Sequence, residues 1–179
     1  MSGEKMVRER ETEINRNAIG HRAAWMGLIY DEAVKAGMDI EEVMRKAIAR
    51  RGEKDGEKFR DKCEDIGDLS SFKKVFLDDL GMSTFDMEVE ECTTDDLKIQ
   101  FHYCPLLAAW KELGMNEEQC AKLCDIAMDG DRNIAKTMGL KFDLNGAIAE
   151  GCATCKLHFH KKSTTYSSHV GLFNVGNFW

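Results

Sequence analysis

The hydrophobic period of the chain changes near residue 82, and this change constrains the fold more than any other feature of the sequence. Before it, apolar residues recur every three to four positions, which predicts helices over about 8–36, after Asp39, and over about 69–80 up to Gly81. The charged stretch 50–63 is either a loop or a solvated helical face. From residue 85 the pattern alternates, and it predicts half-buried strands within "FDMEVEEC" and "DLKIQFHYC", joined by a loop at "TTDD".

The second half of the chain then returns to helices and ends in strands. Residues 105–113 and 116–138 are predicted helices, with Asn116 as N-cap and with Gly114 and Gly139 as stops. Two further strands, in "KFDLNGAIAEG" and "ATCKLHFHK", are joined near Gly151. This order predicts an α+β fold: an antiparallel sheet of about four strands, with the N-terminal helices and a central helix pair packed on it.

The expected organisation is one domain over residues 1–162, followed by a tail. Within the domain, 1–81 form the helical part and 82–162 form the strand–helix–helix–strand part. The tail, 163–179, carries four aromatic residues and no Lys, Arg, Asp or Glu. It is either disordered or laid over an apolar groove of its own chain or of a partner, and the second alternative allows a homo-oligomer.

Composition and charge exclude several classes of function. The net charge is −7 with both signs interleaved, whereas nucleic-acid binding normally needs a basic stripe. No apolar run approaches the roughly 18–20 residues of a membrane span, and no secretory signal begins the chain, so we expect a cytoplasmic protein with no nucleic-acid or membrane partner. Seven cysteines in a reducing compartment indicate metal binding, catalysis or plain burial rather than disulfides.

The single proline, Pro105, follows Cys104 where a strand pattern meets a helix pattern. Proline suits the first position of a helix, so Cys104 is predicted to be the N-cap. Unpaired N–H groups and the helix dipole stabilise a thiolate there, which predicts a lowered pKa and a nucleophile or a metal ligand. The alternative is that the thiol is simply a small buried side chain.

Several other residues are candidates for the same site. Strand alternation predicts that His102 shares a face with Cys104. Cys120 and Cys124 share one helical face, next to Asp125. A zinc site would use three thiols and a histidine, namely Cys104, Cys124, Cys155 and one imidazole, although the spacing departs from that of zinc ribbons and fingers. The histidines of "HFH", His158 and His160, are more typical of a solvent-facing strand.

Three blocks of sequence in order resemble the L-2-amino-thiazoline-4-carboxylic acid hydrolase family. They are "YCPLLAAWKELG", "CAKLCDIAMDGD" and "KFDLNGAIAEGCATCKLHF", within about residues 98–160. The matching positions are Tyr103, Cys104, Pro105, Leu113, Gly114, Cys124, Asp125, Gly151 and Cys155. The extra thiols Cys120 and Cys152, and Lys156 where the family tends to carry an acid, depart from the pattern.

The resemblance implies a hydrolase acting on non-peptide carbon–nitrogen or carbon–sulfur bonds of a small cyclic amidine. The implied reaction opens L-2-amino-thiazoline-4-carboxylate to N-carbamoyl-L-cysteine. Cys104 would be the nucleophile or water activator, His102 or Asp125 would move protons, and Cys155 would act beside them. Tyr103, Cys124, Arg132 and Lys156 would bind substrate. No cofactor is certain, but a divalent metal such as zinc fits the thiols.

A rival interpretation comes from the same glycine-to-cysteine motif before the last strand. It is also similar to the motif of small-ligand-binding domains of the 4-vinyl-reductase type, which bind ligands without necessarily catalysing a reaction. In that case the protein would be a small-ligand or metal-binding module. Metal content and turnover of thiazoline substrates distinguish the two.

Overall fold

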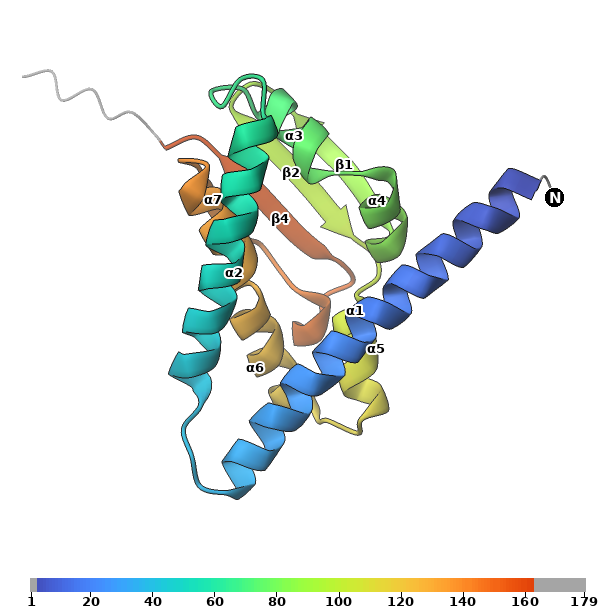
Figure 1. The fold of residues 1–179 in the computed structure, drawn as a ribbon, viewed down its shortest axis with the longest axis vertical. Helices are drawn as coiled ribbons and strands as arrows, with labels where there is room; N and C mark the ends of the chain where they lie inside the picture. Colours follow the sequence, from blue (N-terminus) through green and yellow to red (C-terminus); the bar gives the residue numbers. More distant parts are fainter. Residues whose placement is uncertain (1–2, 163–179) are drawn as a thin grey trace, which may run out of the picture.

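The computed structural model of the protein describes residues 3–162, which form an α+β fold as predicted. Figure 1 shows the long first helix crossing the molecule, with its N-terminal turns projecting beyond the rest of the fold. The elements in chain order are α1 Gly3–Lys35, α2 Glu41–Lys62, α3 Leu69–Phe76, α4 Asp79–Phe85, β1 Met87–Cys92, β2 Asp96–Phe101, α5 Pro105–Glu112, α6 Glu117–Ala127, α7 Asp129–Thr137, β3 Lys141–Leu144, the 3-10 turn η1 Ile148–Glu150, and β4 Cys155–His160.

The strands form one antiparallel sheet in the order β1-β2-β4-β3. Its inner face carries Leu97, Ile99, Leu157 and Phe159, each at most 1% exposed. Phe159 contacts Phe72, Phe76 and Phe142 at ring-centroid distances of 4.9–5.3 Å, which anchors α3 to the sheet. The alternate residues of β2 and β4 are polar and point away from this core, so the alternation in the sequence correctly predicted the two faces.

The charged stretch 50–63 belongs to α2, which decides between the two alternatives that the sequence left open. Gly52 and Gly56 lie on the face of α2 that meets α7. A Cβ on Gly52 would overlap the carbonyl group of Gly130, and one on Gly56 would overlap the side chain of Thr137. The two glycines are therefore close-packing positions between helices rather than loop signals.

A second core lies where α1, α5 and α6 meet. The indole of Trp110 is 1% exposed and donates a hydrogen bond to the carbonyl oxygen of Ala23 at 2.8 Å. The apolar period correctly predicted α1, but its apolar stripe is not the packed face. Ile14, Trp25, Leu28 and Ile29 are 46–62% exposed, because α1 packs through small residues such as Ala23 and Gly27.

The predicted third helix, 69–80, is wrong in its extent and its stop. It divides into α3 and α4, because Leu77 is extended and Asp78 caps a new helix by accepting a hydrogen bond from the N–H of Gly81. Phe85 ends α4 instead of beginning a strand. Asp86 then takes a left-handed conformation, with φ 50°, before β1 starts.

The second half of the chain shows both confirmed and corrected boundaries. Asn116 caps α6 in a capping box with Gln119, and Gly114 and Gly139 have φ of +77° after their helices, as the sequence predicted. The single helix predicted over 116–138 is instead two, because the chain turns at Met128 between α6 and α7. The strand predicted to run to residue 104 ends at Phe101.

Two predictions concern other parts of the molecule. The aromatic tail, 163–179, lies outside the described residues. Among the residues that are described, no helix is both long enough and apolar enough to span a bilayer.

Candidate active site

Cys104 is the N-cap of α5, with Pro105 in the first turn, as the sequence predicted. The segment that leads into it is fixed by two backbone hydrogen bonds: the N–H of His102 donates to Asp86 and the N–H of Tyr103 donates to Phe85. The Cys104 side chain itself makes no capping hydrogen bond. It packs against the core of α1, α5 and α6. The strand–helix junction therefore points this thiol inward.

Three thiols from separate elements gather here: Cys104 before α5, Cys124 on α6, and Cys155 at the start of β4. Cys124 packs against both hydrophobic cores and so lies where they join. The thiols are close enough that a charge on Cys104 or Cys155 raises the pKa of Cys124. The sequence placed these same three residues in one site, and we call them the thiol cluster.

The direction of the thiol pKa shifts is opposite to the expected one. Burial raises the pKa of Cys104, and the N–H groups of Leu107 and Leu106 oppose that shift without overcoming it. Burial, followed by the neighbouring thiols, raises the pKa of Cys124 to about 12. Burial also raises the pKa of Cys155, although the N–H of Ile148 donates to its sulfur at 3.3 Å. The cluster consequently holds neutral thiols near pH 7.

His102 does not join the thiol cluster. Because β2 ends at Phe101, the strand alternation that linked His102 to Cys104 does not extend that far. The imidazole is exposed, and its Nε2 lies 3.3 Å from the carboxylate of Glu88. The expectation that His102 shares a face with Cys104 is therefore wrong.

Asp125 and Arg132 form an ion-pair network on the surface of α6 and α7. The carboxylate of Asp125 lies 2.5 Å from Arg45 of α2 and 2.7 Å from Arg132. Burial acts to raise the pKa of Asp125, but the hydrogen bonds from these two guanidinium groups outweigh it and lower the pKa. Arg132 also binds Asp129 at 2.7 Å. Asp125 is thus held as a carboxylate, and Arg132 already has two acidic partners of its own chain.

Tyr103 lies beside α1, whereas Lys156 is exposed on β4. Arg16 of α1 stacks over the Tyr103 ring at 4.2 Å from its centroid. Tyr103 and Pro105, the neighbours of Cys104, line an open hollow of about 590 Å³ against α1, together with Arg16 and His21. Lys156 is exposed and, as the residue after Cys155 on a strand, points away from the thiols.

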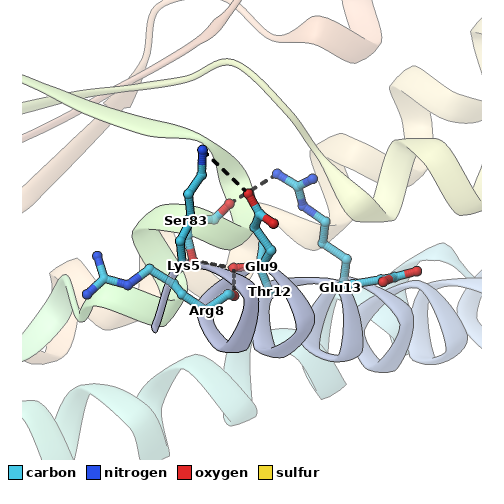
Figure 2. A pocket seen from close by; sticks show the side chains of 7 residues that line it. Lys5, Arg8, Glu9, Thr12, Glu13 and Ser83 are labelled. Carbon is cyan, nitrogen blue, oxygen red and sulfur yellow. Dashed lines mark hydrogen bonds and ion pairs between the residues drawn. The ribbon is translucent and has the colours of Figure 1, made fainter. Parts of the chain in front are cut away.

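A second hollow lies further along α1, where Ser83 of α4 meets the first turns of that helix. Figure 2 shows contacts between some of its side chains: Lys5 lies 3.9 Å from Glu9, and Thr12 lies 2.8 Å from Ser83. The hollow holds the ion pair between Lys5 and Glu9. It also contains none of the residues that the sequence predicted for the site, so the hollow beside Tyr103 is the better candidate.

The sequence did not identify several residues near the candidate site. Arg16 and Arg45 come from α1 and α2, and nothing in their local sequence connects them to Tyr103 or Asp125. Glu150 of η1 is exposed, and its charge raises the pKa of both Cys124 and Cys155. Burial raises the pKa of Asp131 on α7 to about 6.

Comparison with known proteins gives one match. The family model described as L-2-amino-thiazoline-4-carboxylic acid hydrolase matches residues 16–159, which include Arg16, the thiol cluster and the sheet as far as Phe159 of β4. The match confirms the resemblance inferred from the three sequence blocks. Searches among curated proteins and among solved structures gave no match.

Proposed function

The chain belongs to the L-2-amino-thiazoline-4-carboxylic acid hydrolase family, and from this premise we propose that it opens a small cyclic amidine at the thiol cluster. The proposed substrate is L-2-amino-thiazoline-4-carboxylate, and the product is N-carbamoyl-L-cysteine. One observation supports this site above the others: Cys104, Cys124 and Cys155 come together, and Tyr103 and Pro105, the chain neighbours of Cys104, line the hollow against α1.

The proposed reaction adds water to the ring carbon that lies between nitrogen and sulfur. In forming N-carbamoyl-L-cysteine that carbon keeps both of its nitrogen atoms, so the bond that breaks is carbon–sulfur. The oxygen of water becomes the carbonyl oxygen, and the leaving sulfur takes up a proton. Cys104 would add to the ring carbon first and then be displaced by water, or it would activate the water directly.

The environments of the thiols suggest separate roles. Cys104 is the thiol that faces the N–H groups of Leu106 and Leu107, which favour its anion once a base removes the proton. Glu150 replaces His102 as the proposed proton acceptor, because its negative charge raises the pKa of Cys155 in the cluster. Cys124, whose pKa is raised to about 12, stays protonated and would donate a hydrogen bond to the leaving sulfur, which takes its proton from the attacking water.

Substrate binding would use the hollow beside Tyr103. A substrate carboxylate needs a cation there, and Arg16 lines that hollow while stacking on the Tyr103 ring. Arg132, which the sequence suggested for this role, is already bound to Asp125 and Asp129. The hydrogen bonds of Arg16 go to the neutral carbonyl oxygens of Ser83 and Thr84, which do not cancel its charge, so we propose Arg16 as the partner of the carboxylate.

The test is turnover of L-2-amino-thiazoline-4-carboxylate, measured as release of product thiol in acid-quenched, protein-free samples with and without chelator. The variant Cys104→Ser is expected to lose at least about 10³-fold in kcat, since a serine hydroxyl is far harder to ionise than a thiol. Cys152→Ser is the control, because Cys152 is exposed. Circular dichroism checks that both variants fold. Wild-type turnover by Cys104→Ser would disprove the nucleophile role.

A second candidate function, a small-ligand or metal-binding module without catalysis, is favoured by a different observation. The thiols are neutral and buried, and neither of the two hollows described above is lined by Cys104 itself. Such a module would bind thiazoline carboxylates, detected by calorimetry, without converting them. Turnover by the wild-type protein rules it out.

A further inference from the structure

Two histidines and two aspartates form a compact group on the outer face of the sheet, across the sheet from its aromatic core. His158 and His160 are two residues apart on β4, so they share one face, and their rings lie 4.6 Å apart between centroids. Asp143 on the neighbouring β3 pairs in register with His158, and Asp96 on β2 pairs in register with His160. Three strands thus bring the four side chains together.

Each imidazole crosses diagonally to the carboxylate opposite the other histidine. The Nε2 atom of His158 lies 2.7 Å from Asp96, and the Nε2 atom of His160 lies 2.8 Å from Asp143. One ligand atom each from Asp143, His158 and His160 can be chosen so that all three lie within 4.8 Å of one another. Ligands of a tetrahedral ion with bonds of about 2.0–2.1 Å are about 3.4 Å apart. Small side-chain rotations close that difference.

Both ring nitrogens of His160 face oxygen atoms that accept hydrogen bonds, an arrangement that favours a cation at one of them. Its Nδ1 lies 2.9 Å from the carbonyl oxygen of Lys161, while its Nε2 faces the carboxylate of Asp143. Both partners are acceptors, but a neutral imidazole carries a single N–H. If Nδ1–H donates to the carbonyl, the contact between Nε2 and the carboxylate requires a second proton or a metal ion. An Nδ1–H bound to a backbone carbonyl is also the usual support of a histidine that binds metal through Nε2.

Burial and charge are consistent with an ion at this position. The two histidine side chains are about 20% exposed, whereas the Asp143 side chain is 59% exposed, so the group is shielded from the sheet side and open to solvent at the carboxylate. Two nearby ammonium groups are engaged elsewhere: Lys98 pairs with Glu91 at 2.6 Å, and Lys161 pairs with Asp95 at 2.5 Å. Neither neutralises Asp143 or Asp96 directly.

We propose that His158, His160 and Asp143 bind a zinc ion on the outer face of the sheet, with Asp96 as a fourth ligand or as the support of His158. Two imidazoles and carboxylates suit zinc, and an ion there would tie β2, β4 and β3 together. The site is separate from the thiol cluster and does not depend on the proposed hydrolysis. It differs from the thiol-based zinc site considered from the sequence, because the histidines and the cluster sulfurs point to opposite faces of the sheet.

Cobalt titration of the full chain, followed by absorption, tests the site, because cobalt reports its ligands. Nitrogen and oxygen ligands give weak visible bands, whereas thiolates add a strong near-ultraviolet band. We expect one equivalent of cobalt to give visible bands without the thiolate band, and zinc to displace it. His158→Gln and His160→Gln should each weaken binding at least about tenfold. Zinc should raise the melting temperature of the wild-type protein and not that of the double variant.

The matched control is His102→Gln, which removes an imidazole that follows β2 and is paired with the carboxylate of Glu88 on β1. It should bind cobalt as the wild type does. Asp143→Asn guards against misfolding of the histidine variants, because its side chain is largely exposed, and it should also lose at least about tenfold in affinity. Wild-type affinity in the histidine variants or in Asp143→Asn, or a cobalt spectrum dominated by thiolate bands, would overturn the proposal.

Discussion

The two faces of β4 carry the two candidate sites, and their surroundings differ sharply. Inward-facing Cys155, Leu157 and Phe159 are at most 8% exposed, whereas outward-facing His158 and His160 keep about a fifth of their side chains in solvent. Desolvation controls the chemistry of the inner face, since it raises the pKa of each clustered thiol. On the outer face, pairs with carboxylates organise the imidazoles. One strand thus offers neutral sulfur on one side and imidazoles paired with carboxylates on the other.

The largest effect should come from removing the aromatic anchor of the inner face. Phe159→Ala is expected to lower the free energy of unfolding by about 3–5 kcal/mol, because it leaves a cavity among Phe72, Phe76 and Phe142. Urea denaturation followed by circular dichroism measures the loss. Lys156→Ala, on the outer face of the same strand, should change that free energy by no more than about 0.5 kcal/mol. Equal losses in the two variants would remove the distinction between the faces.

The second-largest effect should be a pH dependence of the free energy of unfolding, which arises from the buried thiols and not from the outer face. The folded pKa of Cys124 is raised from 9.0 to about 12, so the folded state holds this proton more tightly than the unfolded chain does. The associated stability is complete below pH 9 and is lost as the pH rises toward 12. The contribution of Cys124 to the free energy of unfolding should fall by at most about 1.4 kcal/mol for each pH unit. Denaturation at pH 8 and pH 10 measures it.

The variant Cys124→Ala serves as the control for that pH dependence. It should show a smaller loss of stability between pH 8 and pH 10 than the wild type, because the buried titrating group is gone. The same loss in both proteins would show that Cys124 does not titrate as its burial implies.

A smaller effect of burial should appear in the rates at which the exposed and the buried thiols react with a labelling reagent. Exposed Cys152 should react with iodoacetamide at pH 7.5 at least about tenfold faster than Cys104, Cys124 or Cys155, because the anion is the reactive species and burial disfavours it. Mass spectrometry of peptides at timed intervals gives the rates. In urea the four rates should converge. Rapid labelling of Cys104 in the folded protein would instead indicate an ionised, open thiol.

The smallest effect should come from the exposed ion pair beside the proposed zinc site. Lys98→Ala removes the pair with Glu91, in which the two side chains are 42% and 41% exposed, so it should lower the free energy of unfolding only slightly. The cost should shrink further in 0.5 M salt, as screening requires. Denaturation at low and high salt measures both. A larger cost that does not respond to salt would mean that the outer face is not solvated as its exposure indicates.

Local sequence predicted what local physics controls. The Cys104–Pro105 cap, the Asn116 cap and the alternation of β4 were all correct, because each depends on residues a few positions apart. Errors arose where local signals competed: Asp78 started a helix before Gly81 could end one. The glycines of α2 were compatible with a loop, but in the structure they allow α2 to pack closely against Gly130 and Thr137 of α7.

The sequence by itself determined the family and the α+β class of the fold, and it grouped the three thiols that the structure brings together. Only the tertiary structure decided the protonation of those thiols and the partners of the charged residues around them. Asp125 binds Arg45, which lies 80 positions away in the sequence. Burial raises the pKa of Cys104 by more than the N–H groups of α5 lower it. Desolvation and ion pairing depend on which distant segments pack together, and no local pattern of residues contains that information.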